Sequence, residues 1–181
     1  MRKIVAGLFV SLDGVAEAPD KWHFPYFNEE MEEAVGAQMA ESDALLLGRV
    51  TFEEWEGYWP GKTGEDPAAE FINGMDKYVV TTTRESTEWE NTTFLRGDLV
   101  ERVTELKRRP GKNVLVSGGP TLVRSLLRHG LLDELRLLIH PIVVGSGQRL
   151  FQDGDQIPLK LTSSTVFTTG VLSLVYEPAE K

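Results

Sequence analysis

A short apolar run that ends in two glycines and a proline is the feature that most constrains how this chain folds. Residues 114–117 (Val-Leu-Val-Ser) are followed by Gly118, Gly119 and Pro120, and an amphipathic segment begins at Thr121. The run is typical of a buried strand, and proline is favoured in the first turn of a helix, where its missing N–H is not needed. The pattern therefore predicts a strand that turns directly into a helix.

The turn between this strand and helix is predicted to bind an anion. Glycine has no side chain, so a ligand can approach the backbone closely at Gly118 and Gly119. The first N–H groups of a helix have no intrahelical partner, and the positive end of the helix dipole lies at the same place. Phosphate is the anion most often held by such a helix start.

A second junction of the same kind occurs earlier in the chain. The three leucines at 45–47 are followed by Gly48, Arg49 and Thr51. An arginine presents a rigid fork of N–H donors to a phosphate, and a threonine hydroxyl supplies a neutral donor. Two such junctions predict that one sheet holds a phosphate-rich cofactor at the ends of several strands.

Length and composition place the chain among ordinary globular proteins. Its 181 residues are 41% hydrophobic and 26% charged, which suits one domain with a sizeable core. The sequence contains no cysteine, so disulfides, zinc–thiolate sites and thiol catalysis are excluded. We predict no metal site and a single domain that covers residues 1–181.

The acidic balance argues against nucleic acid and anionic membranes as partners. The net charge is −9, and such a chain repels polyanions unless it carries a concentrated basic patch. The cluster 107–109 (Lys-Arg-Arg) falls at the end of an expected helix, where basic side chains complement the dipole. The N-terminus enters a strand-like run at once, and no apolar stretch reaches the roughly 20 residues that span a bilayer. We therefore expect a cytoplasmic protein that acts on a small molecule.

Hydrophobic periodicity and capping residues predict alternating strands and helices, followed by a run of strands. Strands are expected at residues 3–10, 44–47, 77–83, 93–95, 113–117, 134–144, 159–167 and 171–177. Helices are expected at residues 28–41, 51–58, 68–75, 98–109 and 121–129, with Gly130 as a left-handed C-cap. This order predicts a three-layer α/β/α fold, with a mostly parallel central sheet and antiparallel C-terminal strands.

Six motifs in this order resemble the dihydrofolate reductase superfamily. The resemblance is closest to the branch shared with the reductase domain of the bifunctional riboflavin-biosynthesis deaminase-reductase, and it covers nearly the whole chain. It implies a dihydrofolate-reductase-like fold. The motifs lie at residues 11–14 (SLDG), 43–51 (DALLLGRVT), 77–83 (KYVVTTT), 116–122 (VSGGPTL), 130–135 (GLLDEL) and 141–147 (PIVVGSG).

The resemblance implies that NADPH lies across the carboxyl ends of the strands. The first junction then contacts the pyrophosphate and the adenosine phosphate. The threonines after the third expected strand lie near the adenine ribose and its 2′-phosphate, and the 117–122 segment is the second pyrophosphate site. The implied cofactor-binding residues are Gly48, Arg49, Thr51, Thr81, Thr82, Thr83, Ser117, Gly118, Gly119, Pro120, Thr121 and Leu122.

Two residues are candidates for a catalytic role. Asp13 either organises a turn by accepting backbone N–H bonds or orders a water or the loop near the nicotinamide. His23 is the only histidine beside the cluster of aromatic residues in the loop at 22–27, so it is the candidate proton donor. The cluster is either core packing under a loop or a wall for a flat ring substrate. Its other members are Trp22, Phe24, Tyr26 and Phe27.

The chain departs from the family pattern at the substrate. Dihydrofolate reductases direct a carboxylate of the helix after the first loop at the pterin. The corresponding helix here carries a solvated acidic face, so no pterin carboxylate is assigned. That face is formed by Glu29, Glu30, Glu32, Glu33 and Glu41, opposite Met31, Val35 and Met39. We also expect no attached deaminase domain with its zinc ligands.

The sequence therefore predicts an NADPH-dependent reductase of a small heterocyclic substrate, pterin-like or pyrimidine-like, or of a conjugated substrate. The alternative is a non-catalytic nucleotide-binding or scaffold protein that keeps the fold. We also expect a homodimer, because residues 134–144 and the C-terminal hairpin are apolar and rich in β-formers, and unpaired edges of this kind tend to be covered. The resemblance to the reductase-domain family also implies a dimer.

Overall fold

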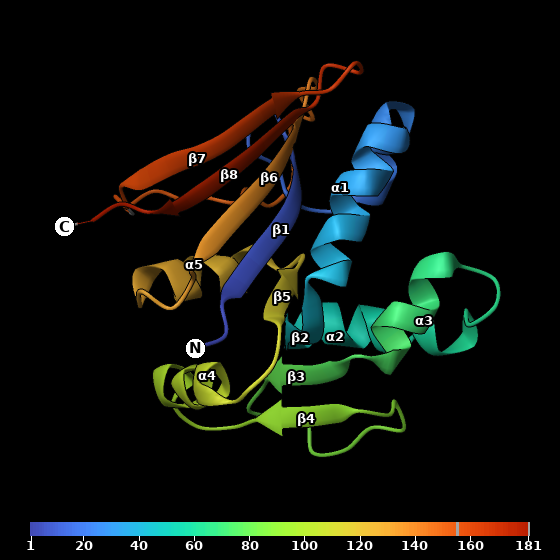
Figure 1. Cartoon of the computed structure of the whole chain (residues 1–181), viewed down its shortest axis with the longest axis vertical. Coiled ribbons are helices and arrows are strands. Elements are labelled where there is room, and N and C mark those ends of the chain that lie inside the picture. The colour runs from blue at the N-terminus through green and yellow to red at the C-terminus, as the bar shows by residue number, and fades with distance from the viewer. Residues whose placement is uncertain (155, 181) are drawn as a thin grey trace.

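A computed structural model of the chain describes residues 1–154 and 156–180. Within these residues, eight strands form one sheet in the order β4-β3-β2-β5-β1-β6-β8-β7 (Figure 1). The strands are β1 (Ile4–Ser11), β2 (Ser42–Gly48), β3 (Asp76–Val80), β4 (Thr92–Leu95), β5 (Asn113–Ser117), β6 (Glu134–His140), β7 (Leu159–Val166) and β8 (Leu172–Pro178). The helices are α1 (Glu29–Ala40), α2 (Arg49–Glu56), α3 (Pro67–Gly74), α4 (Leu99–Arg108) and α5 (Pro120–Arg128).

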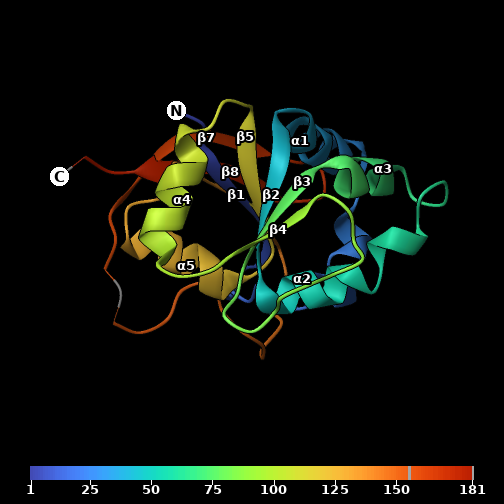
Figure 2. The ribbon, with the colours of Figure 1, turned by 90° about the horizontal axis from the view of Figure 1, so that it is seen from below.

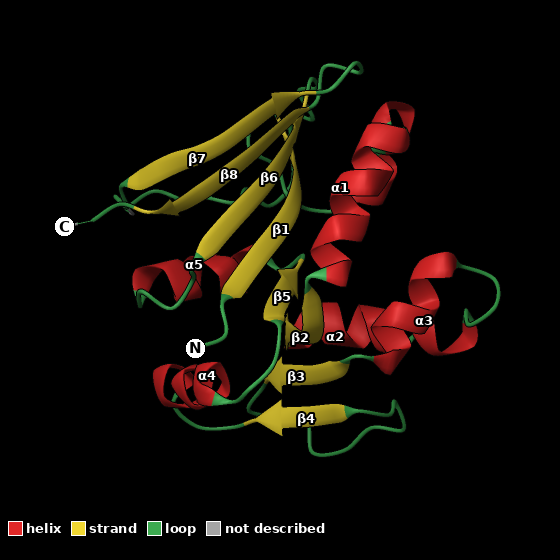
Figure 3. Cartoon of the chain, in the orientation of Figure 1, coloured by secondary structure: helices red, strands yellow, loops and turns green. Residues whose placement is uncertain are grey.

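The sheet is parallel from β4 to β6 and antiparallel from β6 through β8 to β7. The long antiparallel strands lie together at one end of the sheet (Figure 3). The predicted α/β fold with a mostly parallel sheet and antiparallel C-terminal strands is therefore confirmed. Among the residues described, no helix combines the length and hydropathy needed to cross a bilayer.

Two helical layers cover the sheet (Figure 2). The side chains of Ala44 and Leu46 on β2 belong to the core that contains α4 and α5 residues. The alternate residues Leu45 and Leu47 belong to the core under α2 and α3. Because β2 is buried on both faces, it reads as a nearly continuous apolar run, as central parallel strands do.

The connections reverse between β2 and β5, which are neighbours in the sheet. The helix after β2, α2, lies on one face, and the helix after β5, α5, lies on the other (Figure 2). In open α/β sheets this arrangement opens a crevice at the carboxyl ends of the two strands, and ligands bind there.

Most predicted helix ends agree with the structure. The side chains of Asn28 and Asp98 cap α1 and α4 by accepting the backbone N–H of Met31 and Glu101. Gly130 has a φ of 67°, the left-handed conformation expected after α5. The expected helix 51–58 is displaced, since α2 begins at once after β2, at Arg49, and ends at Glu56.

Two predicted strands are too long. The strand expected at 77–83 ends at Val80, because the Thr81 hydroxyl accepts the backbone N–H groups of Thr83 and Arg84 and turns the chain. The strand expected at 134–144 ends at His140. Pro141 follows and has no N–H to donate to a sheet.

Candidate cofactor and substrate site

The two predicted junctions meet at the carboxyl ends of β2 and β5, the place that we call the β2–β5 crevice. Thr51, in the first turn of α2, lies against the glycines that begin α5. A Cβ atom added to Gly119 would lie 3.3 Å from the Thr51 Oγ1, and one added to Gly118 would lie 3.7 Å from the Thr51 Cγ2. On the other side, a Cβ added to Gly48 would lie 3.9 Å from the Cβ of Leu122. Residues about 70 positions apart in the sequence thus become neighbours, because β2 and β5 pair in the sheet.

The two helices at this crevice differ from the other three in how they begin. The first turns of α1, α3 and α4 are capped by the side chains of Asn28, Asp66 and Asp98. In contrast, α2 begins after Gly48 and α5 after Gly119, and neither start has a side-chain cap among the described residues. Their first N–H groups are therefore available to an anion, and the positive ends of both dipoles lie beside it. This arrangement fits a pyrophosphate.

The backbone at Gly118 and Gly119 requires glycine. Both residues have a φ of 66°, in the left-handed region that L side chains rarely adopt. Gly48 has a φ of −75°, a conformation open to other residues. The glycine pair therefore builds the α5 turn, whereas Gly48 mainly keeps that side of the crevice free of a side chain.

The three threonines after β3 divide into two roles. Thr81 is buried, and its hydroxyl is used as an acceptor within the turn. Thr82 and Thr83 are exposed at the carboxyl end of β3, next to β2 in the sheet. Thr82 and Thr83 are therefore the members of this group that remain accessible to a ribose or phosphate.

Three arginines supply positive charge along this edge. Arg49 is the first residue of α2, its side chain is about half exposed at 48%, and it forms an ion pair with Glu53 at 3.1 Å. Arg84 and Arg96 follow the carboxyl ends of β3 and β4, and the guanidinium of Arg96 donates to the backbone carbonyl of Arg84. The sequence analysis missed the latter pair. Their position in the sequence, shortly after an expected strand of the parallel sheet, could have identified them.

Arg84 is held in place by a carboxylate of α2. Its two terminal nitrogens donate to the two oxygens of Glu56 at 3.0 and 2.9 Å. The bonds from Arg84 lower the pKa of Glu56, so the pair stays ionised. The fixed guanidinium links α2 to the turn that carries the exposed threonines.

Asp13 ties the loop after β1 to the loop after β6. Its carboxylate accepts the Ser11 hydroxyl at 2.5 Å and the backbone N–H groups of Val144 and Gly145 at 3.1 and 2.9 Å. The hydrogen bond from Ser11 and those from the two amides lower the pKa of Asp13 to about 2. Asp13 accepts backbone N–H bonds, as its structural alternative predicts, and an ionised carboxylate of this kind holds no proton to donate. A role beside the nicotinamide stays a prediction.

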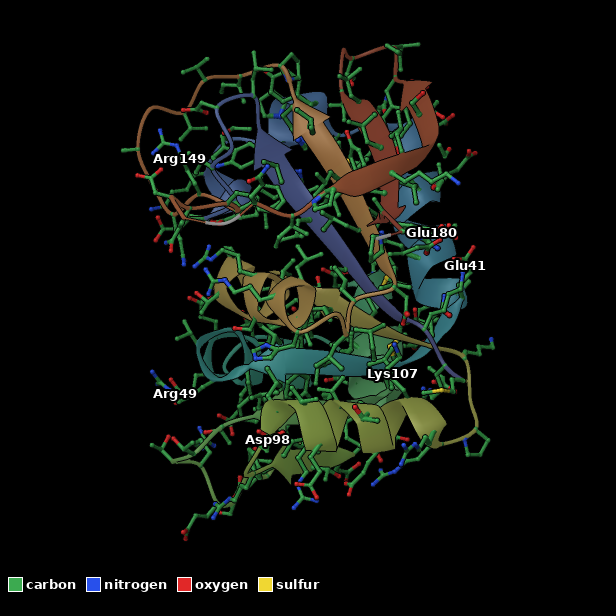
Figure 4. All side chains as sticks on the ribbon, turned by 90° about the vertical axis from the view of Figure 1, so that its left-hand side faces the viewer. Glu41, Arg49, Asp98, Lys107, Arg149 and Glu180 are labelled. Carbon is green, nitrogen blue, oxygen red and sulfur yellow. The ribbon has the colours of Figure 1, made fainter. Side chains whose placement is uncertain are left out.

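The loop after β6 is also fastened to α5. Buried Arg124 donates from one nitrogen to the carbonyls of Arg149 and Leu150 at 2.9 and 3.0 Å. The amide of Gln148 donates to the Thr121 hydroxyl at 3.0 Å, next to the start of α5. Figure 4 shows that Arg149 and Arg49 lie on the same edge of the molecule, opposite Lys107 and Glu41. The sequence analysis missed Arg124, because an arginine in an amphipathic helix gives no sign of burial.

The aromatic cluster packs around two histidines. His23 stacks on Phe9 of β1, with ring centroids 4.7 Å apart and planes 9° apart. His140 at the end of β6 is fully buried and meets Trp22 and Tyr26 edge-on at 5.1 and 5.7 Å. The expectation that His23 is the only histidine in this cluster is therefore wrong. His140 was missed because only the pairing of β1 with β6 brings it there.

The acidic face of α1 is as solvated as predicted. Glu29, Glu32, Glu33 and Glu41 are exposed. Glu30 is partly buried and accepts the backbone N–H and hydroxyl of Thr168, at 2.8 and 2.6 Å. These contacts fix the β7–β8 turn onto α1 and leave the family's pterin carboxylate unassigned.

Sequence comparison places these features in a family. The model of the RibD C-terminal domain matches residues 2–173. The chain belongs to the RibD C-terminal domain family. It is 33% identical to the uncharacterized protein YyaP of Bacillus subtilis strain 168, over 97% of this chain and 94% of that protein. It is 28% identical to YwjB of the same strain, over 94% of this chain and 95% of that one.

Solved structures of RibD-type proteins share the fold. A putative riboflavin biosynthesis protein from Shewanella sp. PV-4 matches with a TM-score of 0.80 at 20% identity, covering 98% of this chain and 99% of that one. The Thermotoga maritima diaminohydroxyphosphoribosylaminopyrimidine deaminase/5-amino-6-(5-phosphoribosylamino)uracil reductase matches with a TM-score of 0.69 at 19% identity. That match covers 98% of this chain and 57% of the Thermotoga protein. The predicted relationship to reductase domains of this kind is confirmed, together with the dihydrofolate-reductase-like fold.

The role of Asp13 can be tested through stability. Because its pKa is depressed in the folded protein, its contribution is present above the ordinary value of 3.8 and is lost as the pH falls toward about 2. Asp13→Asn should therefore lower the Tm near neutral pH, and the difference from the wild type should shrink as the pH approaches 2. Asp153→Asn, at an exposed site, is the control and should have little effect at either pH. An equal Tm for the wild type and Asp13→Asn near neutral pH would contradict the anchoring role.

Proposed function

We propose that this protein is an NADPH-dependent reductase of a small heterocyclic substrate, pterin-like or pyrimidine-like, or of a conjugated substrate. The observation that carries the proposal is the meeting of two uncapped helix starts at the β2–β5 crevice. Two such sites side by side suit the two phosphates of a dinucleotide better than a single anion. The membership of the RibD C-terminal domain family supports the same cofactor.

The order of the strands gives the proposed cofactor a direction. From the β2–β5 crevice, β3 and β4 lie on one side and β1 and β6 on the other. The first side carries Thr82, Thr83 and the guanidinium groups of Arg84 and Arg96, which suit a ribose with a 2′-phosphate. The nicotinamide end then lies toward β1 and β6, where Asp13 holds the loop and the aromatic cluster begins.

In this arrangement the chain supplies mainly binding and orientation. When bound, the nicotinamide supplies the hydride. The exposed rings of Phe24 and Phe27 offer flat apolar surface to a heterocycle, and His23, which contacts both rings, is the candidate to supply the proton. The name of one solved relative, a pyrimidine reductase-like protein from Corynebacterium diphtheriae with a TM-score of 0.69, supports a heterocycle of that class.

Turnover separates this function from the alternative of a non-catalytic nucleotide-binding or scaffold protein. NADPH oxidation is followed with the purified protein and a panel of dihydropterin, dihydrofolate and amino-pyrimidine substrates. The reductase predicts oxidation that depends on one of these substrates. Tight NADPH binding without oxidation by any member of the panel would favour the non-catalytic alternative.

The 2′-phosphate assignment predicts that NADPH binds more tightly than NADH. Arg49→Ala should weaken NADPH binding by about 1–2 kcal/mol, roughly tenfold in Kd, the scale of one charge-assisted hydrogen bond at a partly exposed site. NADH should lose less, since it lacks the extra phosphate. Isothermal titration calorimetry measures both, with Arg108→Ala at an exposed site of α4 as the control. An identical loss for the two nucleotides would mean that Arg49 contacts only the shared pyrophosphate.

The glycine turn predicts a sharper loss. Gly119→Val should abolish detectable NADPH binding while the fold survives, because a branched side chain enters the crevice and strains a left-handed residue. Gly130→Val is the matched control, since Gly130 has a φ of 67° and open space around its Cβ position. It carries the same backbone strain away from the crevice and should bind NADPH normally. A folded Gly119→Val protein with unchanged affinity would place the cofactor elsewhere.

We also propose that the protein forms a homodimer through its antiparallel strands. β7 is an edge strand that is largely exposed, with Leu161 and Val166 exposed by 48% and 72%. Exposed apolar edges of this kind are usually covered in soluble proteins. An interface above about 1,000 Å² is expected for a stable dimer. Light scattering should give twice the mass of the 20.2 kDa chain, and Val166→Asp should shift the protein toward the monomer. A single-chain mass for the wild type at micromolar concentration would contradict the proposal.

A further inference from the structure

Two buried ring nitrogens in the aromatic cluster have no hydrogen-bond partner among the residues that the structure describes. They are the Nδ1 of His23 and the Nε2 of His140. His23 is 8% exposed and His140 is completely buried. Buried polar atoms are almost always paired, so two such atoms in one cluster require an explanation. A third polar group that lies between them would satisfy both.

The two rings are close neighbours that meet edge to face. Their centroids are 6.1 Å apart and their planes are 84° apart. The two nitrogens do not bond to each other directly, since neither has a hydrogen-bond partner among the described residues. A single water molecule can join two neighbouring polar groups of this kind with two ordinary hydrogen bonds.

The hydrogen-bond pattern of His140 fixes what its free nitrogen can do. The Nδ1 of His140 lies 2.9 Å from the carbonyl oxygen of Leu138, which can only accept, so Nδ1 carries the hydrogen. In the neutral ring the Nε2 is then an acceptor. The group between the rings must therefore donate a hydrogen to His140, as water does.

The surroundings disfavour the protonated form of both rings. Phe9, Trp22 and Tyr26 meet His140 edge-on, and His23 stacks on Phe9. Burial lowers the pKa of both histidines, and the neighbouring His140 lowers that of His23 further, while Asp20 acts in the opposite direction. The enclosure thus favours a neutral bridging group over an anion.

The pair also lies at the right end of the sheet. His140 is opposite Ser11 where β6 pairs with β1, and β1 pairs in turn with β5, which ends at the proposed pyrophosphate site. Neighbouring strands are about 4.8 Å apart, so the histidines lie within the span of a dinucleotide that crosses this edge.

We propose that one water molecule joins the Nδ1 of His23 to the Nε2 of His140, and that His140 thereby acts as a positioning residue for His23, the proton donor of the reduction. The catalytic half of this inference rests on the proposed function.

Hydride addition to the carbon of a C=N, C=O or C=C bond breaks the π bond and leaves its electron pair on the second atom. A proton from protonated His23 forms the new bond to that atom, and His23 is left neutral until solvent protonates it again.

Histidine NMR tests the link without any cofactor. The chain contains three histidines, and His129 is exposed at the end of α5, so ¹⁵N-histidine labelling gives a spectrum that can be assigned by substitution. At pH 8, where the rings are neutral, His140→Phe should move the Nδ1 signal of His23, because the bridging acceptor is lost while an aromatic ring remains. His140→Gln places an amide near the position of Nε2 and should preserve the signal. His129→Phe should leave it unchanged.

The result that overturns the link is a His23 Nδ1 signal that is unchanged at pH 8 in a folded His140→Phe protein. If that variant fails to fold, His23→Phe gives the reciprocal reading on the Nε2 of His140, and an unchanged Nε2 signal overturns the link equally.

The catalytic half has its own readout, in which His23→Phe lowers kcat by about 100-fold with little change in the KM for NADPH. Unchanged kcat in His23→Phe would refute the proton-donor role, whether or not NADPH binds.

Discussion

The free N–H groups at the starts of α2 and α5 are the constraint on which this site depends. Both helices follow directly from buried strands, so their first turns are fixed by the sheet and cannot move to find other partners. The other helices satisfy their starts with Asn28, Asp66 or Asp98. Two neighbouring helix starts without side-chain caps lack the stabilisation that a cap provides. A bound anion that accepts their N–H groups supplies it instead.

The rest of the carboxyl edge is organised around that point in two halves. On the side of β3 and β4, guanidinium groups and hydroxyls surround the end of the crevice, and Glu56 fixes one of the arginines to α2. On the side of β1 and β6, aromatic side chains take the place of the guanidinium groups. The loop after β6 joins the halves, since Asp13 holds it to β1 and Arg124 holds it to α5. The same fold can therefore keep one cofactor while changes in the ring cluster alter the substrate.

The sequence predicted the features that local chemistry determines. Glycine, proline and capping residues located the turns at Gly118–Pro120 and the starts of α1 and α4, because backbone geometry at those positions depends on the residue itself. Strand ends were less predictable. The turn at Thr81 depends on a side-chain bond that alternation does not reveal, and the apolar residues after His140 continue the pattern of a strand without belonging to it. Arg124 and His140 were missed because their partners are distant in sequence and are brought near only by strand pairing.

A crystal structure of the protein with NADP⁺ tests the central claim most directly. The account predicts pyrophosphate oxygens within hydrogen-bonding distance, about 2.7–3.2 Å, of first-turn N–H groups of both α2 and α5. It also predicts that the adenosine end lies over β3 and that the nicotinamide lies over β1. A pyrophosphate that contacts neither helix start, or a cofactor that lies in the reverse direction along the edge, would contradict it.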